Sequence, residues 1–138
     1  MNTAIVLAGG SGRRMNSDIP KQYMMLKGKP VIYYSLKAFE DFDAVTGVIL
    51  VTIADDIEYC RREMVNKYNF TKVKTIVAGG MERYDSVCNA LDTIIEDNSL
   101  VFIHDGARAC IDKDTLAKLY SDAVSYTHLR AHETCADL

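Results

Sequence analysis

Four runs of apolar, largely β-branched residues alternate along the chain with segments whose apolar residues recur every three or four positions. The runs occupy residues 3–8, 47–53, 73–78 and 100–104. This alternation is typical of strand–helix–strand units on a parallel sheet, and continuous apolar strands indicate burial on both faces. We therefore predict an α/β fold in three layers, with a mostly parallel sheet between helices on each side.

Helices are predicted in the segments that follow these runs. The first is expected to have Pro30 in its opening turn, and the third to be capped by Asp85 or Ser86. Asp112 and Asp114 form an acidic start that suits the positive end of the fourth helix dipole. The four apolar stripes are formed by Ile32, Leu36 and Phe39; by Ile57, Cys60, Met64 and Tyr68; by Val87, Ala90, Leu91, Ile94 and Ile95; and by Leu116, Leu119, Tyr120 and Ala123.

Charge and cysteine content exclude several classes of protein. The 138 residues carry 16 basic and 19 acidic side chains, a net charge of −3, so no overall positive field attracts nucleic acid or an anionic membrane. No apolar run approaches the roughly 20 residues that span a bilayer, and the N-terminus lacks a secretory pattern, which favours a cytoplasmic protein. Cys60, Cys88, Cys110 and Cys135 form no C-x-x-C pair, so we expect buried, reduced thiols.

Residues 125–138 interrupt the alternation where the next buried strand is expected. We therefore predict that residues 1–124 are the folded part of one domain and that residues 125–138 are a non-native tail, similar to adapter read-through. An alternative for this tail is a metal site, because His128 and His132 are four residues apart with Glu133 and Cys135 close by.

A glycine-rich loop, Gly9-Gly10-Ser11-Gly12, directly follows the first predicted strand. Glycines let backbone N–H groups turn toward one point without a Cβ in the way, which favours a bound anion. A pair of arginines ending in Arg14, together with Lys21, adds three cations nearby. The loop is therefore predicted to bind a triphosphate; the alternative is a flexible turn with solvated arginines.

Two later segments are expected at the same edge of the sheet. Gly79 and Gly80 end the third predicted strand and lead to Ser86, a turn that either allows close approach of a flat base or is an ordinary connection. Asp105 follows the fourth run, and a carboxylate beside a phosphate loop predicts Mg²⁺ held jointly with the nucleotide's phosphates. The alternative role of Asp105 is to cap a turn.

Four ordered motifs resemble those of the 2-C-methyl-D-erythritol 4-phosphate cytidylyltransferase family. The motifs are Leu-Ala-Gly-Gly-Ser-Gly-Arg-Arg-Met at 7–15, Pro20-Lys21-Gln22-Tyr23, Gly79-Gly80-x-x-Arg83-x-x-Ser86 and His104-Asp105-Gly106-Ala107-Arg108. The resemblance covers about residues 2–124. It implies a Rossmann-like nucleotidyltransferase fold and transfer of CMP from CTP to 2-C-methyl-D-erythritol 4-phosphate, with release of pyrophosphate, in non-mevalonate isoprenoid biosynthesis.

The resemblance also implies a role for each matching residue. Arg14 and Lys21 correspond to cations that stabilise the transition state, and Asp105 corresponds to the ligand of the Mg²⁺ cofactor. The parent enzyme is expected to be a homodimer. Contact with CTP is implied for Ala8, Gly9, Gly10, Ser11, Gly12, Gly80, Arg83, Ser86 and Ala107.

The chain departs from the family in three respects. Ala109 stands where the family usually has proline, and Met81 occupies a position that is often polar. The second half of the family, with acceptor-binding residues and a dimerisation arm, does not follow residue 124, so we expect a truncated, poorly soluble or inactive chain. The alternatives are a ribitol-5-phosphate cytidylyltransferase, which differs mainly in acceptor, and an inactive CTP-binding fragment.

Overall fold

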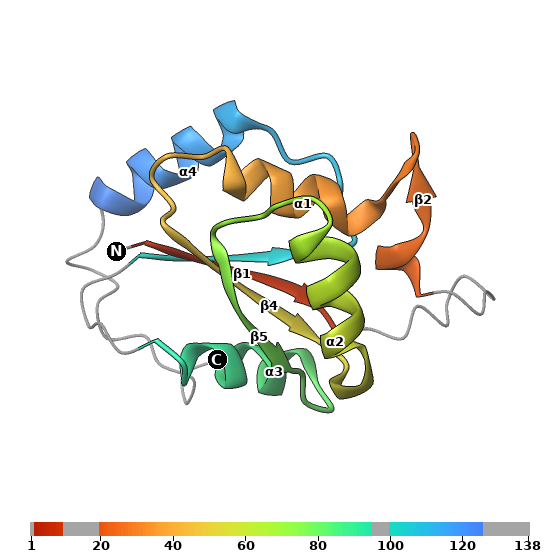
Figure 1. Cartoon of the computed structure of the whole chain (residues 1–138). Helices are drawn as coiled ribbons and strands as arrows, with labels where there is room; N and C mark the ends of the chain where they lie inside the picture. Colours follow the sequence, from red (N-terminus) through yellow and green to blue (C-terminus); the bar gives the residue numbers. More distant parts are fainter. Residues whose placement is uncertain (1, 10–19, 95–99, 126–138) are drawn as a thin grey trace.

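The computed structural model describes residues 2–9, 20–94 and 100–125, and it contains the predicted parallel sheet (Figure 1). Its strands are β1 (Thr3–Ala8), β4 (Gly47–Thr52), β5 (Val73–Ala78) and β6 (Val101–Asp105). They lie in the order β5-β4-β1-β6, and each neighbouring pair is parallel. The predicted bounds are confirmed for β1 and β5, whereas β6 is shifted by one residue, so that Asp105 is its last residue.

Helical segments connect these strands. The longer ones are α1 (Val31–Glu40), α3 (Arg83–Leu91) and α4 (Lys113–Ser125). The helix α2 (Ile57–Cys60) continues into η4 (Arg61–Asn66), which is π-helical, and the turns η2 (Lys21–Tyr23) and η3 (Ala54–Asp56) are 3₁₀-helical. No helix in the described ranges is long and apolar enough to cross a membrane.

Alternate side chains of β1 point to opposite faces of the sheet and belong to two hydrophobic cores. Val6 packs in one core with Leu36 of α1 and Leu116 of α4. Leu7 packs in the other core with Val87 of α3. Figure 1 accordingly shows α1 and α4 on one side of the sheet and α3 on the other, which confirms the three-layer prediction.

The two outer strands are less buried than predicted. All six residues of β1 are buried, whereas β5 and β6 contain half-buried and exposed side chains because each is an edge strand in the described sheet. Ile103 of β6 is 40% exposed, and Leu119 of α4 is 51% exposed. Burial on both faces therefore holds for β1 and β4 but not for the edge strands.

The third helix begins earlier than predicted. α3 starts at Arg83, so Ser86 lies inside the helix and does not cap it. Asp85 occupies the third position, where its carboxylate accepts the backbone N–H of Glu82 at 3.2 Å. Asp85 therefore does stabilise the first turn, but from within the helix.

A short hairpin precedes the first helix and was not indicated by the sequence pattern. It pairs β2 (Met25–Leu26) with β3 (Lys29–Pro30) in antiparallel register. Lys27 and Gly28 connect the strands with φ values of 52° and 85°, the left-handed conformation that tight hairpins require. Pro30 thus ends the hairpin, and α1 starts one residue later than predicted.

The described cysteines differ in exposure. Cys60, Cys88 and Cys110 are free thiols, of which Cys60 is buried, Cys88 half-buried and Cys110 exposed. The prediction of a buried thiol is therefore wrong for Cys110. Cys135 and the rest of the predicted tail beyond residue 125, with both of its histidines, lie outside the described residues.

Candidate active site

The carboxyl ends of all four parallel strands lie at one edge of the sheet. After β5 the chain passes through α3 to β6 on the other side of β1, so the strand order reverses at β1. Open α/β sheets bind ligands outside the carboxyl ends of the strands at such a point. The candidate site therefore lies beyond Ala8, the last residue of β1.

Asp105 lies at this edge, directly beside β1. It pairs with Leu7 in the register of the two strands, and the next N–H, that of Gly106, donates to the Leu7 carbonyl at 2.7 Å. A Cβ on Gly106 would lie only 3.0 Å from that carbonyl oxygen, so glycine allows the close approach. The half-exposed carboxylate of Asp105 accepts the Ala107 N–H at 3.2 Å and lies 4.0 Å from the Arg108 guanidinium.

The second glycine turn meets the first glycine loop at Ser86. The Gly79 N–H donates to the Thr52 carbonyl at 2.7 Å, and the Gly80 N–H donates to Ser86 Oγ at 3.1 Å. A Cβ on Gly79 would lie 2.8 Å from this hydroxyl, and one on Gly9 would lie 3.9 Å from it. The buried Ser86 side chain therefore brings the two glycine segments to one place.

The Lys21 segment is attached to the same strand end. Lys21 is exposed in η2, while its neighbour Gln22 is buried and donates from Nε2 to the Ala8 carbonyl at 2.7 Å. Figure 1 shows the β2 hairpin, which follows η2, at the end of the sheet toward which the strand arrows point. The Lys21 segment and the Asp105 carboxylate thus lie next to the end of β1.

Comparison with known proteins identifies the family. Residues 2–131 match the family model of 2-C-methyl-D-erythritol 4-phosphate cytidylyltransferase. The chain belongs to this family. It is 55% identical over 124 residues to the 2-C-methyl-D-erythritol 4-phosphate cytidylyltransferase of Lachnospira eligens, covering 90% of this chain and 54% of that protein. With the enzyme of the same name from Lachnoclostridium phytofermentans it is 51% identical over 120 residues, covering 87% of this chain and 51% of that protein.

A solved structure supports the fold of this cytidylyltransferase family member. The 4-diphosphocytidyl-2C-methyl-D-erythritol synthase from Anaerococcus prevotii matches with a TM-score of 0.74 at 24% sequence identity, over 88% of this chain and 50% of that chain. The predicted nucleotidyltransferase fold is therefore confirmed. The chain spans about half the length of the curated relatives that it matches.

The structure brings together most of the predicted site residues that it describes. Arg83 opens α3, three positions before Ser86, and its side chain is exposed. Gly10, Ser11, Gly12 and Arg14 lie outside the described residues, so their roles stay predictions. The residues at or next to the carboxyl edge are Ala8, Gly9, Lys21, Gly80, Ser86, Asp105 and Ala107.

Ser35 supports the site although no sequence motif indicates it, and His104, which belongs to the fourth motif, supports it as well. Ser35, buried in α1, donates from Oγ toward the carbonyl oxygens of Gly106 and Arg108, at 3.3 and 3.0 Å. The His104 Nε2 lies 3.0 Å from the same Arg108 oxygen. Ser35 lies on the buried face of α1 together with Ile32, Leu36 and Phe39. A polar residue on this apolar face is the sequence signal that could have identified it. These contacts fix the loop that follows Asp105.

Asp105 fits a magnesium ion that is shared with a nucleotide. Within the described ranges, no three histidine, cysteine, aspartate or glutamate residues gather as a metal site. Mg²⁺ commonly takes one or two carboxylates together with substrate phosphates, rather than an all-protein cage. A single half-exposed carboxylate beside the end of β1, where the predicted phosphate loop begins, suits that mode of binding.

Proposed function

We propose that this chain supplies the nucleotide site of a cytidylyltransferase that transfers CMP from CTP to 2-C-methyl-D-erythritol 4-phosphate and releases pyrophosphate. The observation that carries the proposal is the convergence of Asp105, both glycine segments and the Lys21 segment on the carboxyl end of β1. The names of the curated relatives support the choice of nucleotide and acceptor. A cytoplasmic location and a homodimer stay predictions.

The proposed reaction joins an acceptor phosphate oxygen to the α-phosphorus of CTP. The bond from that phosphorus to the β-phosphate oxygen breaks, and pyrophosphate leaves with the bonding electrons. The acceptor phosphate is already an anion near neutral pH, so the site needs no strong base. Such transfers depend mainly on positioning and on neutralisation of charge.

The residues of the site divide these tasks. Lys21 and Arg14 would neutralise the charge that develops on the phosphates, and backbone N–H groups of the glycine loop would bind the same oxygens. Asp105 would hold Mg²⁺, which supplies further neutralisation when it is bound. The turn at Gly80, fixed by its bond to Ser86, would receive the cytosine.

Binding and transfer are tested separately. Calorimetry of the chain with CTP and Mg²⁺ tests the nucleotide site, with ATP as the comparison. Transfer is measured as pyrophosphate release with either 2-C-methyl-D-erythritol 4-phosphate or ribitol 5-phosphate, using this chain and a chimera that continues it with the remaining sequence of the Lachnospira eligens relative. Selective CTP binding and release with the first acceptor are expected. No CTP binding, together with no release by the chimera, would refute the proposal.

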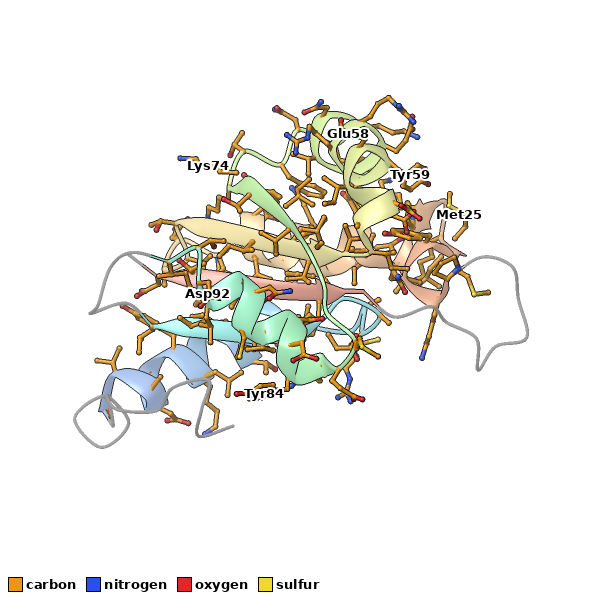
Figure 2. All side chains as sticks on the ribbon, turned by 90° about the horizontal axis from the view of Figure 1, so that it is seen from below. Met25, Glu58, Tyr59, Lys74, Tyr84 and Asp92 are labelled. Atoms are coloured by element: carbon orange, nitrogen blue, oxygen red, sulfur yellow. The ribbon has the colours of Figure 1, made fainter. Side chains whose placement is uncertain are left out.

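Charge-removing variants of the chimera test the assigned cations. Lys21→Ala and Arg14→Ala are each expected to lower turnover by on the order of 10²–10³-fold, as for loss of a donor that stabilises transition-state charge. Lys74→Ala is the matched control, because Lys74 is an exposed lysine near the amino end of β5. Met25 lies in the hairpin that directly follows the Lys21 segment, and Figure 2 shows Lys74 on the opposite side of the molecule from Met25. Near-normal turnover of the Lys21 variant would contradict its assigned role.

A further inference from the structure

Gln22 is a buried polar residue between the exposed Lys21 and the half-buried Tyr23. Its side chain is 3% exposed, whereas the preceding Lys21 is exposed. A buried amide group is costly unless it is hydrogen-bonded, so its partner fixes where this segment can lie. One such partner is the carbonyl oxygen of Ala8, 2.7 Å from Nε2.

The bond to Ala8 determines the orientation of the Gln22 side chain. A carbonyl oxygen only accepts hydrogen bonds, so the amide nitrogen must face it. Ala8 is the last residue of β1, and Gly9 begins the phosphate loop. Gln22 therefore links the Lys21 segment to the point at which the phosphate loop leaves the sheet.

Tyr23 provides a second link, to the neighbouring strand. Its hydroxyl lies 2.8 Å from Thr52 Oγ1 and 3.2 Å from Cys60 Sγ, and its ring packs edge-on against Tyr59 with 5.5 Å between centroids. Burial raises the pKa of both the Tyr23 hydroxyl and the Cys60 thiol, so both groups keep their protons.

The two links end on paired residues. Ala8 and Thr52 are partners in the parallel register of β1 and β4, and both are buried. Consecutive residues of η2 thus bond to the ends of the two central strands. Two attachment points on adjacent strands fix the segment in direction as well as in distance, which one point would not do.

We propose that Gln22 is a positioning residue that acts on the nucleotide through Lys21, by holding the backbone of Lys21 over the end of β1. Tyr23 supports the same arrangement from the β4 side. This inference rests on the proposed function, because it assumes that Lys21 contacts a CTP phosphate. Without the bond to Ala8, the segment would lose this link to β1, and the lysine would be held less firmly at the strand end.

A double-mutant cycle tests the inference on the whole chain. The affinity for CTP with Mg²⁺ is measured by calorimetry for the parent, Gln22→Met, Lys21→Ala and the double variant. Methionine keeps the length of glutamine but donates no hydrogen bond. We expect each single variant to bind CTP about tenfold more weakly, the scale of one charge-assisted hydrogen bond, and the double variant to bind like Lys21→Ala alone.

The outcomes separate this inference from the proposed function. Additive losses, or unchanged binding by Gln22→Met, would overturn the positioning role while CTP binding by the parent stands. A parent chain that does not bind CTP would overturn the proposed function and this inference with it. Asn2→Leu is the matched control: the Asn2 amide also donates to a backbone carbonyl, that of Ala44 at 3.0 Å, but from the opposite edge of the sheet.

Tyr23→Phe keeps the test decisive if Gln22→Met does not fold. It removes only a hydroxyl, leaves the ring in place, and is expected to weaken CTP binding by a smaller factor that also vanishes in the Lys21→Ala background. Tyr34→Phe is its control, because the Tyr34 hydroxyl donates to the Leu26 carbonyl in the hairpin, away from Ala8 and Thr52. Equal effects of the two tyrosine variants on CTP affinity would overturn the inference.

Discussion

Replacing Gly80 by alanine tests whether the second glycine turn depends on the absence of a side chain. A Cβ at Gly80 would lie 2.2 Å from the Cβ of Asp85 and 3.3 Å from its Cγ. Ordinary contact begins at 3.4 Å, so 2.2 Å leaves a shortfall of 1.2 Å between the turn and α3. Asp85 does not give way freely, because its carboxylate accepts the Glu82 N–H in the first turn of the helix.

The cost follows from the contacts that this separation breaks. The bond from the Gly80 N–H to Ser86 Oγ, now 3.1 Å, is lost, and the buried Ser86 hydroxyl loses a partner. An unsatisfied buried polar group costs about 1–3 kcal/mol, and crowding adds about 1–3 kcal/mol where it is not relieved. Since the shift relieves part of the crowding, we expect Gly80→Ala to lower the free energy of unfolding by about 2 kcal/mol.

The assay is urea unfolding followed by far-UV circular dichroism, together with calorimetry of CTP binding. Gly47→Ala is the matched control, because a Cβ at Gly47 would meet no atom within 4 Å. The control is expected to change stability by less than about 0.5 kcal/mol and to leave CTP affinity unchanged. Gly80→Ala should also weaken CTP binding. A Gly80→Ala variant as stable as Gly47→Ala would refute the steric reasoning.

Three further variants probe other parts of the molecule. Gly28→Ala should lower stability by about 1 kcal/mol through backbone strain alone, measured by urea unfolding, because φ is 85° while the space around it is open. The Thr115 N–H donates to Asp112 Oδ1 at 2.7 Å, which confirms the acidic start of α4. This hydrogen bond lowers the pKa of Asp112, so the carboxylate stabilises the fold at pH values above its ordinary pKa of 3.8. Asp112→Ala should therefore lower the melting temperature at neutral pH, by an amount that shrinks as pH falls through the lowered pKa. Asp105→Asn should remove most of the dependence of CTP affinity on Mg²⁺ in calorimetry, with little change in melting temperature, since its side chain is half-exposed.

The sequence predicted the sheet well because the strands are local patterns. A continuous apolar run such as 3–8 needs no distant information to be recognised as a buried strand. The hairpin was missed because strands of two residues carry no periodicity, and the positive φ of Lys27 is not encoded by its residue type. The start of α3 was misplaced because Asp85 acts from the third helical position and not from before the helix.

The position of the site was predictable for a topological reason. Motifs that directly follow parallel strands meet at one edge, so Gly9, Gly80 and Asp105 were expected together. The residues that hold this edge were not predictable, because their partners are distant in sequence. Ser35 bonds to carbonyl oxygens more than 70 positions away, and Gln22 bonds to Ala8 across the glycine loop.

The described loops of the site are attached to the two central strands. Gly106 donates to Leu7, and Gln22 donates to Ala8. Thr52 accepts a bond from the Gly79 N–H, and its hydroxyl shares a hydrogen bond with that of Tyr23. Since β1 and β4 are held by apolar packing on both faces, losing one of these bonds displaces a loop without opening the sheet. Gln22→Met should therefore lower CTP affinity with little loss of stability, because its bond ends on a strand. Gly80→Ala should lower both CTP affinity and stability, because its added side chain pushes directly against a helix.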